Sequence, residues 1–186
     1  MLISSNSEMG FGADIEQHFS ADCYSRSCGG YDIDKMEGRL RIAKASLDYD
    51  VVVVHAYTNN GGQIAMLEQL VKTWIDKEHA GHIFITGSVA SYFESYKPSI
   101  KDWRYVHDKA GQDAFCKRLN KKIQEGKYPF KLTNLRLGML DTKRSRMKEH
   151  FVSGVTSDTF CKTIDYVLGL PQDTLVPEIV IETTDK

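Results

Sequence analysis

A run of four valines in the segment DVVVVHA, residues 50–56, constrains the fold more than any other feature. Apolar β-branched runs of this kind suit strands that are buried on both faces, and such strands occur mainly in parallel sheets. Parallel strands need long crossover connections, which are usually helices. The next segment, residues 62–77, has apolar residues at every third or fourth position, as an amphipathic helix does. The chain is therefore predicted to form a parallel sheet covered by helices.

The alternation of strand and helix continues along the whole chain. Strands are expected at residues 1–4, 22–25, 50–56, 81–88, 132–137 and 178–182. Helices are expected at residues 12–19, 37–46, 62–77, 103–124 and 157–168. Such an alternation forms right-handed βαβ crossovers. The sequence predicts an α/β fold with a Rossmann-type doubly wound parallel sheet flanked by helices, in a single domain over residues 1–186.

Composition and charge argue against several classes of partner. The net charge is −1, which gives no electrostatic basis for binding nucleic acid or an anionic membrane. No apolar run approaches the roughly 20 residues of a membrane span, and the first residues do not have the pattern of a signal peptide. The four cysteines form no CxxC pair, and no histidine lies at zinc-ligand spacing beside them. We expect a cytoplasmic protein with reduced thiols and no metal site.

The loop after the first expected strand contains a glycine pattern. Gly10 and Gly12 lead directly into the expected helix at residues 12–19. Such a turn lets backbone amides approach a pyrophosphate at the amino terminus of the helix. A Gly-x-Gly sequence is also compatible with an ordinary turn. Its position after the first strand of an α/β pattern favours dinucleotide binding.

The segment Ser25-Arg26-Ser27 follows the second expected strand. In dinucleotide-binding folds an acidic residue at this place binds the ribose 2′-hydroxyl, whereas an arginine accommodates a 2′-phosphate. Arg26 between two hydroxyl side chains favours NADP(H) over NAD(H), and the alternative is a solvated surface arginine. Asp32 and Ile33 are expected to flank the adenine ring.

These features together resemble the short-chain dehydrogenase/reductase family over nearly the whole chain. The Gly-rich turn of that family, TGxxxGxG, is matched by SNSEMGFG at residues 5–12, with Asn6 in place of the first glycine. The family's NNAG turn appears in altered form at residues 54–57. Ser88, in the segment ITGSVA, matches the catalytic serine, and Tyr105 and Lys109 match the YxxxK pair.

The resemblance implies a catalytic tetrad of Asn60, Ser88, Tyr105 and Lys109, with Asn59 as the competitor for the role of Asn60. Tyr105 would be the general acid and base. The ordinary tyrosine pKa near 10 is too high for this role at neutral pH, and a lysine one helical turn away stabilises the phenolate. Ser88 would hold the substrate oxygen, and Asn60 would hold a water that links Lys109 to solvent.

The resemblance also implies the cofactor-binding residues. In the first loop they are Ser5, Asn6, Ser7, Met9, Gly10, Phe11 and Gly12. After the second and third strands they are Arg26, Ser27, Asp32, Ile33, His55 and Ala56. The remaining ones are Tyr105, Lys109, Gly138, Leu140 and Thr142. Thr142 is expected to contact the carboxamide of the nicotinamide, and the alternative is that it caps a following helix.

The activity implied is an NADP(H)-dependent oxidoreductase that transfers hydride between nicotinamide and a small carbonyl or alcohol substrate. The alternative is a non-catalytic dinucleotide-binding sensor or interaction protein on the same fold, which the altered NNAG turn favours. The helices at residues 62–77 and 103–124 match those that pair between subunits in the family. The resemblance therefore implies a homo-oligomer, either a dimer or a tetramer.

Overall fold

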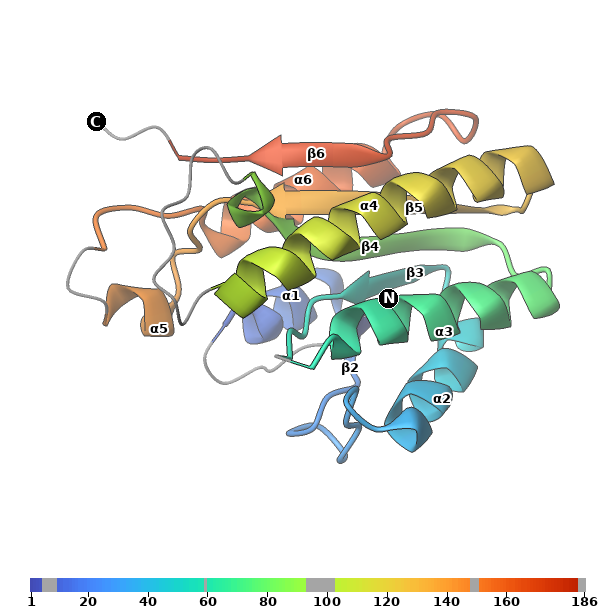
Figure 1. The fold of residues 1–186 in the computed structure, drawn as a ribbon, viewed down its shortest axis with the longest axis horizontal. Coiled ribbons are helices and arrows are strands. Elements are labelled where there is room, and N and C mark those ends of the chain that lie inside the picture. Colours follow the sequence, from blue (N-terminus) through green and yellow to red (C-terminus); the bar gives the residue numbers. More distant parts are fainter. Residues whose placement is uncertain (5–9, 59, 93–102, 148–150, 184–186) are drawn as a thin grey trace.

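The structure is a computed structural model that describes residues 1–4, 10–58, 60–92, 103–147 and 151–183. At its centre lies a six-stranded sheet with the strand order β2-β1-β3-β4-β5-β6 (Figure 1). All neighbouring strands in this sheet run parallel. The strands are β1 (Leu2–Ser4), β2 (Asp22–Cys23), β3 (Val51–Val54), β4 (Gly81–Ser88), β5 (Phe130–Leu137) and β6 (Glu178–Ile181).

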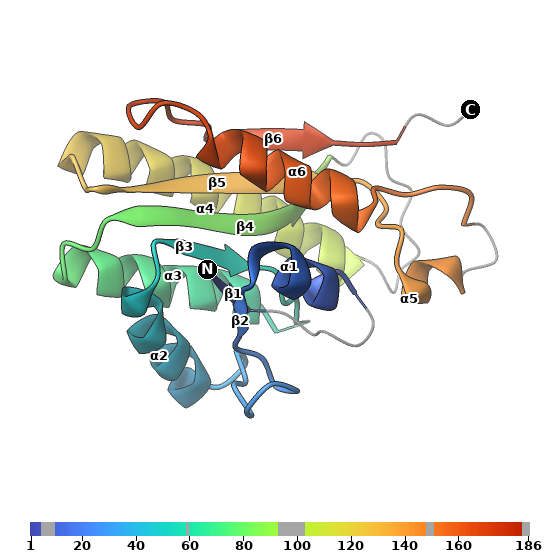
Figure 2. The same ribbon diagram turned by 180° about the vertical axis from the view of Figure 1, so that it is seen from behind.

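Helices cover both faces of the sheet. They are α1 (Gly12–Phe19), α2 (Met36–Ala45), α3 (Gly62–Asp76), α4 (Trp103–Gly126), α5 (Lys143–Arg146) and α6 (Ser157–Leu168). Two short 3₁₀ helices are η1 (Ser46–Asp48) and η2 (Val89–Ser91). Helices α2, α3 and α4 lie on one face, and α1 and α6 lie on the other (Figures 1 and 2). The predicted fold class, a doubly wound parallel sheet between two helical layers, is confirmed.

The valines of β3 show why this sequence forms a central strand. Val52 and Val54 pack into the hydrophobic cluster beneath α2, α3 and α4. Val53 points to the other face and packs into the cluster beneath α1 and α6. All three side chains are fully buried. Successive side chains of a strand alternate between faces, so only a continuous apolar run fills both layers of the core.

Only β4 has the expected boundaries: β1 and β6 each differ by one residue, β3 spans residues 51–54 rather than 50–56, and β2 and β5 each differ by two residues. Residues 22–25 are expected to be extended, but β2 ends at Cys23 because the chain turns at Ser25. The Ser25 Oγ accepts a hydrogen bond from the Cys28 backbone N–H at 3.2 Å, and the Ser25 carbonyl accepts one from Tyr31 at 3.0 Å. Strand β5 begins two residues earlier than expected, because Phe130 pairs with Gly81 at the start of β4.

The winding of the chain reverses between β1 and β3, which are neighbours in the sheet. From β1 the chain proceeds to β2 on one side, and from β3 it proceeds to β4 on the other. The backbone N–H groups of His55 and Ala56 both donate to the Ser4 carbonyl, at 2.9 Å and 2.6 Å, so the chain after β3 stays close to the end of β1. In open α/β sheets, ligands bind outside the carboxyl ends of the strands at such a reversal.

The apolar stripe of α3 is occupied within this chain. Met66, Leu67, Leu70 and Trp74 are all fully buried against the sheet. A homo-oligomer formed through α3 and α4 therefore stays a prediction, because the core accounts for this stripe. Among the described residues, none of the helices combines the length and the apolar character that a membrane crossing requires.

Candidate active site

Lys109 lies in the second turn of α4 and is buried against the carboxyl end of β4, with 3% of its surface exposed. Its Nζ donates to Gln63 Oε1 at 2.6 Å, to the Thr86 carbonyl at 2.8 Å and to Gln112 Oε1 at 3.2 Å. All three acceptors are neutral, so the ammonium has hydrogen-bond partners but no direct counter-ion among them. Burial lowers the pKa of Lys109 to about 7, against the opposing effect of the Asp113 charge.

Tyr105 lies one helical turn before Lys109, and its ring is half-buried. The Lys109 Nζ lies 5.8 Å from the centre of the Tyr105 ring and 5.1 Å from the centre of the Tyr57 ring. The two rings pack edge to face, with centroids 5.0 Å apart. Lys109 therefore lies close to two phenol rings, which is the arrangement that the YxxxK spacing predicts for Tyr105.

Tyr57 is a member of this cluster that the predicted set of site residues does not contain. Its hydroxyl donates to Asp108 Oδ2 at 3.1 Å. Burial, together with the Asp108 charge, raises the pKa of Tyr57 above its ordinary value. The phenol of Tyr57 is thus held in its neutral form. The sequence signal for this residue is its place in the altered NNAG turn, directly after His55 and Ala56.

Ser88 is the last residue of β4 and is buried. Its Oγ accepts a hydrogen bond from the Ala90 backbone N–H at 3.2 Å, which begins η2. Because a lone pair of the Oγ accepts this bond, the Ser88 hydroxyl can still donate its proton to another acceptor. Thr86, whose carbonyl binds Lys109, lies two residues earlier on the same strand. Ser88 and Lys109 are thus brought to the same end of β4.

Gln63, rather than Asn60, is the α3-region side chain that reaches Lys109 among the described residues. Asn60 is exposed in the turn before α3, and Asn59 lies outside the described residues. Gln63 is buried in the first turn of α3, and its Nε2 donates to the Val54 carbonyl at 3.0 Å and to the Thr86 carbonyl at 3.1 Å. Gln63 therefore joins β3, β4 and Lys109, and the role expected of Asn60 stays a prediction.

A second buried polar group lies behind this cluster. Arg136 of β5 is 2% exposed and forms ion pairs of 3.2 Å with both Asp113 and Glu178. It also donates to Ser91 Oγ at 2.7 Å, in the 3₁₀ helix η2 that follows Ser88. Asn134 donates to Asp113 at 2.8 Å. This network fixes α4 on β5 and β6 behind the end of β4.

A cavity of about 360 Å³ lies at the carboxyl ends of β1, β2 and β3. Its lining includes the predicted residues Arg26, Ser27, Asp32, Ile33 and Ala56. The lining residues that the prediction does not contain are Ser4, Ser25, Tyr31, Tyr57 and Thr58. The buried Ser4 Oγ has no hydrogen-bond partner among the described residues, and buried hydroxyls are rarely left so. The cavity therefore has an unsatisfied polar group at the place where dinucleotides bind in this fold class.

Arg26 is mostly exposed and forms ion pairs with Asp32 at 2.8 Å and with Asp34 at 3.3 Å. The hydrogen bond from Arg26 lowers the pKa of the Asp32 carboxyl below its ordinary value. The sequence predicts that Arg26 faces a 2′-phosphate. It does not show that Asp32 and Asp34 pair with this arginine. A phosphate at this place would meet Arg26 together with both acids.

The predicted cofactor residue His55 lies on the α1 side of the sheet. Its ring stacks on Phe11 with an interplanar angle of 5°, and it also packs against Phe160 of α6. Burial, with a smaller effect from the Lys109 charge, lowers the pKa of His55 to about 4. Its Nδ1 has no hydrogen-bond partner among the described residues. His55 is therefore a neutral group near the end of β3.

A second cavity, of about 320 Å³, lies between the start of α1 and the segment after β5. The predicted residues Gly10, Phe11 and Thr142 line it. Thr142 caps α5, because its Oγ1 accepts a hydrogen bond from the Ser145 backbone N–H at 3.1 Å and donates to Ser145 Oγ at 3.0 Å. The helix-cap alternative for Thr142 is thus observed, and its contact with a carboxamide stays a prediction.

Of the other predicted cofactor residues, three have a described place in the fold and four lie outside the described residues. Gly12 begins α1 and is buried. Gly138 donates its backbone N–H to the Ile181 carbonyl at 2.8 Å, and Leu140 pairs with Val155. Ser5, Asn6, Ser7 and Met9 lie outside the described residues. The cofactor contacts assigned to all of these residues stay predictions.

No protein-family model matches the sequence, and no curated protein is significantly similar to it. Solved structures are similar in fold. Serine dehydrogenase from Escherichia coli has a TM-score of 0.70 and 14% identity, over 98% of this chain and 97% of that one. The 3-alpha-hydroxysteroid dehydrogenase from Pseudomonas sp. B-0831, solved with NADH, has a TM-score of 0.72 and 16% identity, over 97% of this chain and 93% of that one.

A short chain dehydrogenase from Burkholderia cenocepacia J2315, solved with NADP, has a TM-score of 0.73 and 15% identity, over 96% of this chain and 86% of that one. At such low identities a comparison shows the fold alone. The predicted resemblance rests on the glycine turn, Ser88, Tyr105 and Lys109. It is confirmed for the fold. The chain has the fold of the short-chain dehydrogenases and reductases.

Proposed function

We propose that this protein is a nicotinamide-dinucleotide-dependent oxidoreductase of the short-chain dehydrogenase/reductase type, acting on a small carbonyl or alcohol. The observation that carries the proposal is the buried Lys109 beside the Tyr105 ring at the carboxyl end of β4. A lysine buried without a counter-ion among its direct partners is a strained arrangement, and such perturbed groups are concentrated in functional sites. The cavity at the winding reversal lies on the same edge of the sheet.

Each polar residue of the cluster has a chemical role in this proposal. The bound dinucleotide would supply or accept the hydride. When a carbonyl is reduced, Tyr105 gives its hydroxyl proton to the carbonyl oxygen, and the cationic Lys109 stabilises the resulting phenolate. Ser88 donates its hydroxyl hydrogen bond to the same oxygen and holds it near Tyr105. Gln63 fixes the position of Lys109, and Asn60 holds water at the mouth of the site.

The cavity at β1, β2 and β3 is proposed to hold the adenosine part of the dinucleotide. The Ser4 hydroxyl and the small residue Ala56 give a polar and uncrowded floor for a ribose. We propose that NADP(H) is preferred over NAD(H), because Arg26 with Ser25 and Ser27 forms one wall of the cavity. Asp32 and Asp34 compete with a 2′-phosphate for Arg26, so the expected preference is small.

The test is turnover by the purified protein with NADPH and a panel of small carbonyl compounds. Tyr105→Phe removes the hydroxyl that donates the proton and keeps the ring, so the rate should fall by roughly 10²–10⁴-fold. Tyr166→Phe is the matched control: it makes the same change at an exposed residue of α6 that lines neither cavity, and it should keep the full rate. Equal rates for the Tyr105 variant and the wild type would contradict the role of Tyr105.

A second candidate function is non-catalytic dinucleotide binding, as in a sensor or interaction protein. The observation in its favour is that all three protons of the Lys109 ammonium already have acceptors within the protein. A ribose hydroxyl must replace one of these acceptors before Lys109 can bind it. Under this alternative the protein binds the dinucleotide but gives no turnover, and Tyr105→Phe leaves the affinity unchanged.

The remaining parts of the proposal concern assembly and location. We propose a single-domain protein of the cytoplasm that forms a homodimer or homotetramer through α3 and α4. The exposed side chains of α4 include Lys117, Lys121 and Glu125, so this contact would be polar. Light scattering on the purified chain measures the mass directly, and a monomer at micromolar concentration would contradict the oligomer.

A further inference from the structure

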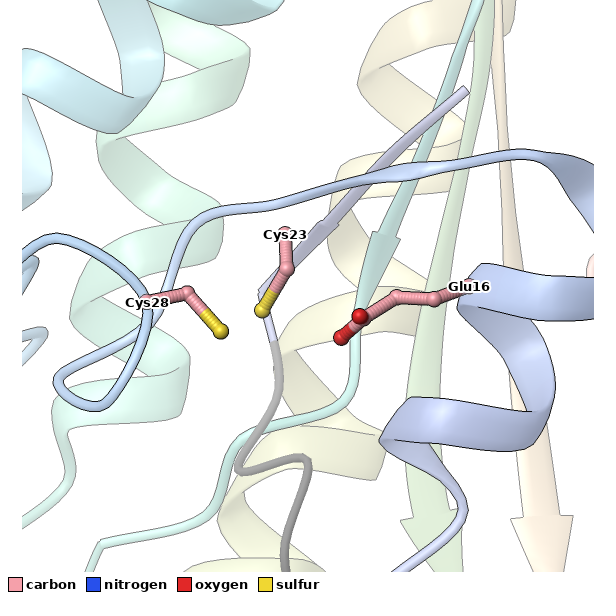
Figure 3. Close-up of side chains that lie close together, drawn as sticks. All are labelled: Glu16, Cys23 and Cys28. Atoms are coloured by element: carbon pink, nitrogen blue, oxygen red, sulfur yellow. The ribbon is translucent and has the colours of Figure 1, made fainter.

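Three potential metal ligands from separate segments meet near β2. They are Glu16 of α1, Cys23 at the end of β2 and Cys28 in the following loop. Their ligand atoms all lie within 4.8 Å of one another. Figure 3 shows the two thiols turned toward each other, with the Glu16 carboxylate turned toward Cys23. All three residues are half-buried, so an ion from solution can reach the group.

Backbone hydrogen bonds hold the three segments in place. The carbonyl of Glu16 accepts a hydrogen bond from the Ala21 N–H at 3.0 Å, which fixes the turn from α1 into β2. Cys28 is brought back toward Cys23 because its N–H donates to the Ser25 Oγ at 3.2 Å. The Cys23 thiol itself contacts this Ser25 Oγ at 3.5 Å. The cluster is thus part of the folded turn, although the spacing of the two cysteines in the sequence is not that of a CxxC pair.

The Glu16 carboxylate supplies an independent observation. Its Oε1 is buried and accepts no hydrogen bond from any described residue. A buried carboxylate oxygen without a donor is unfavourable, and a cation is the group that would satisfy it. Two sulfur atoms and a carboxylate therefore face one another in this cluster.

The chemistry of the three groups selects one class of ion. Thiolate sulfur suits zinc and similar soft or borderline ions, whereas Mg²⁺ and Ca²⁺ prefer oxygen ligands. Zn–S distances are about 2.3 Å and Zn–O distances about 2.1 Å, so two sulfur ligands of one tetrahedral ion lie about 3.8 Å apart. The three ligand atoms lie within 4.8 Å of one another, which exceeds this span by at most about 1 Å. Only small side-chain rotations are needed to bring the three atoms onto one ion.

We propose that Glu16, Cys23 and Cys28 form a binding site for a thiophilic divalent cation of the Zn²⁺ type, with solvent as the fourth ligand. Binding releases the protons of the two thiols. The ion would fix the loop between the two cysteines, whose residues Ser25, Arg26 and Ser27 line the cavity at β1. The metal site does not depend on the proposed oxidoreductase activity.

The test uses the full chain, purified without a polyhistidine tag and kept reduced with a phosphine. Co²⁺ is the probe, because thiolate ligation gives a charge-transfer band in the near ultraviolet. We expect the band to saturate at one equivalent and to disappear when Zn²⁺ is added. Zn²⁺ should also raise the melting temperature, since it binds the folded chain.

Variants decide whether these three residues are the ligands. Cys28→Ser and Glu16→Gln should each weaken Co²⁺ binding by at least roughly tenfold. Cys116→Ala is the control, because this thiol lies in the hydrophobic cluster on the other face of the sheet, and the variant should bind Co²⁺ as the wild type does. Circular dichroism of each variant before titration separates loss of the site from loss of the fold.

Three results would overturn the proposal. The first is that the reduced wild-type chain gives no band and holds no Zn²⁺ after dialysis. The second is that the band survives in both ligand variants. The third is that one equivalent of hydrogen peroxide joins Cys23 and Cys28 in a disulfide, forming two waters, at the same rate with and without Zn²⁺. In that case the pair is a thiol redox site and not a metal site.

Discussion

The Lys109 ammonium and the Gln63 side chain are joined by a buried hydrogen bond of 2.6 Å, in which the lysine donates to a neutral amide oxygen. A carboxylate at this distance would neutralise the lysine and keep it protonated. An amide only orients it, so burial determines its proton affinity and lowers the pKa of Lys109 to about 7. The charge on which the proposed chemistry depends is therefore sensitive to pH near neutrality.

Gln63→Glu tests this relationship. In the wild type, turnover should decline as the pH rises above about 7, because Lys109 loses the charge that stabilises the Tyr105 phenolate. Glutamate at position 63 places a negative charge beside the ammonium and raises its pKa. The alkaline decline should therefore move to higher pH, by at least about one unit. The measurement is the pH profile of kcat with NADPH and an accepted carbonyl.

Gln69→Glu is the control for this experiment. Gln69 lies on the same helix, is half-buried, and donates to Thr73 rather than accepting a hydrogen bond from Lys109. The Gln69→Glu variant adds the same charge to α3. The alkaline decline of its kcat should occur at the same pH as in the wild type. An unchanged profile for Gln63→Glu, or equal shifts for both variants, would show that the hydrogen bond does not set the proton affinity of Lys109.

Lys109 should also make folding stability depend on pH. Its pKa is about 7 in the folded chain and 10.5 in the reference state, so the unfolded chain binds more protons between these values. Stability therefore rises with pH in this window. Between about pH 7 and about pH 8.5 the free energy of unfolding should increase by on the order of 1–2 kcal/mol. Urea unfolding followed by circular dichroism measures this.

Lys109→Met removes the titrating group and keeps most of the side-chain volume. The rise of the free energy of unfolding between about pH 7 and about pH 8.5 should therefore disappear. His55 and His82 do not interfere, because their lowered pKa values of about 4 and ordinary values of 6.5 place their effect below pH 7. The thiols of Cys116 and Cys161 have pKa values raised from 9.0, so their effect begins above this window. A rise that persists in the methionine variant would refute the assignment to Lys109.

Arg26 should determine the choice between the two dinucleotides. Arg26→Gln removes the cation expected to face a 2′-phosphate, so the affinity for NADPH should fall about tenfold while that for NADH changes little. Asp34→Asn removes one of the two carboxylates that pair with Arg26. This variant should strengthen NADPH binding relative to NADH. Both affinities are measured by calorimetric titration.

Lys44→Gln is the charge-matched control, since Lys44 lies on α2 and does not line the cavity. It should leave both affinities unchanged. Should Arg26→Gln weaken NADPH and NADH to the same extent, the 2′-phosphate assignment is wrong, and Arg26 only holds the loop through its ion pairs.

The sequence predicts the fold well, because burial on two faces has a plain sequence signature. Val52, Val53 and Val54 fill both layers of the core, and any interruption of that apolar run by a polar residue would disturb one of them. Boundaries are predicted less well where side chains interrupt the strand pattern. At β2, the Ser25 hydroxyl draws the chain into a turn, and the expected strand ends two residues early.

The site is predicted only in part, because pairings between distant segments leave no periodic pattern. The YxxxK spacing places Tyr105 and Lys109 together through helix geometry alone. Gln63 lies in the largely apolar helix α3, so its neighbours in the sequence do not mark it as a site residue. Its contact with Lys109 depends on how α3 packs against α4. The pairing of Arg26 with Asp32 and the meeting of Glu16 with Cys23 likewise depend on loop and helix geometry that spacing does not encode.

The most direct test of the central claim is a calorimetric titration of the wild-type chain with NADPH and with NADH, beside the variant Ala56→Trp. Ala56 lines the cavity at the ends of β1 and β3, and a tryptophan there would fill it. We predict saturable binding of one dinucleotide per chain, with NADPH somewhat tighter, and loss of binding in a folded Ala56→Trp variant. The absence of binding by the wild type, or undiminished binding by the variant, would contradict a dinucleotide site at the winding reversal of this sheet.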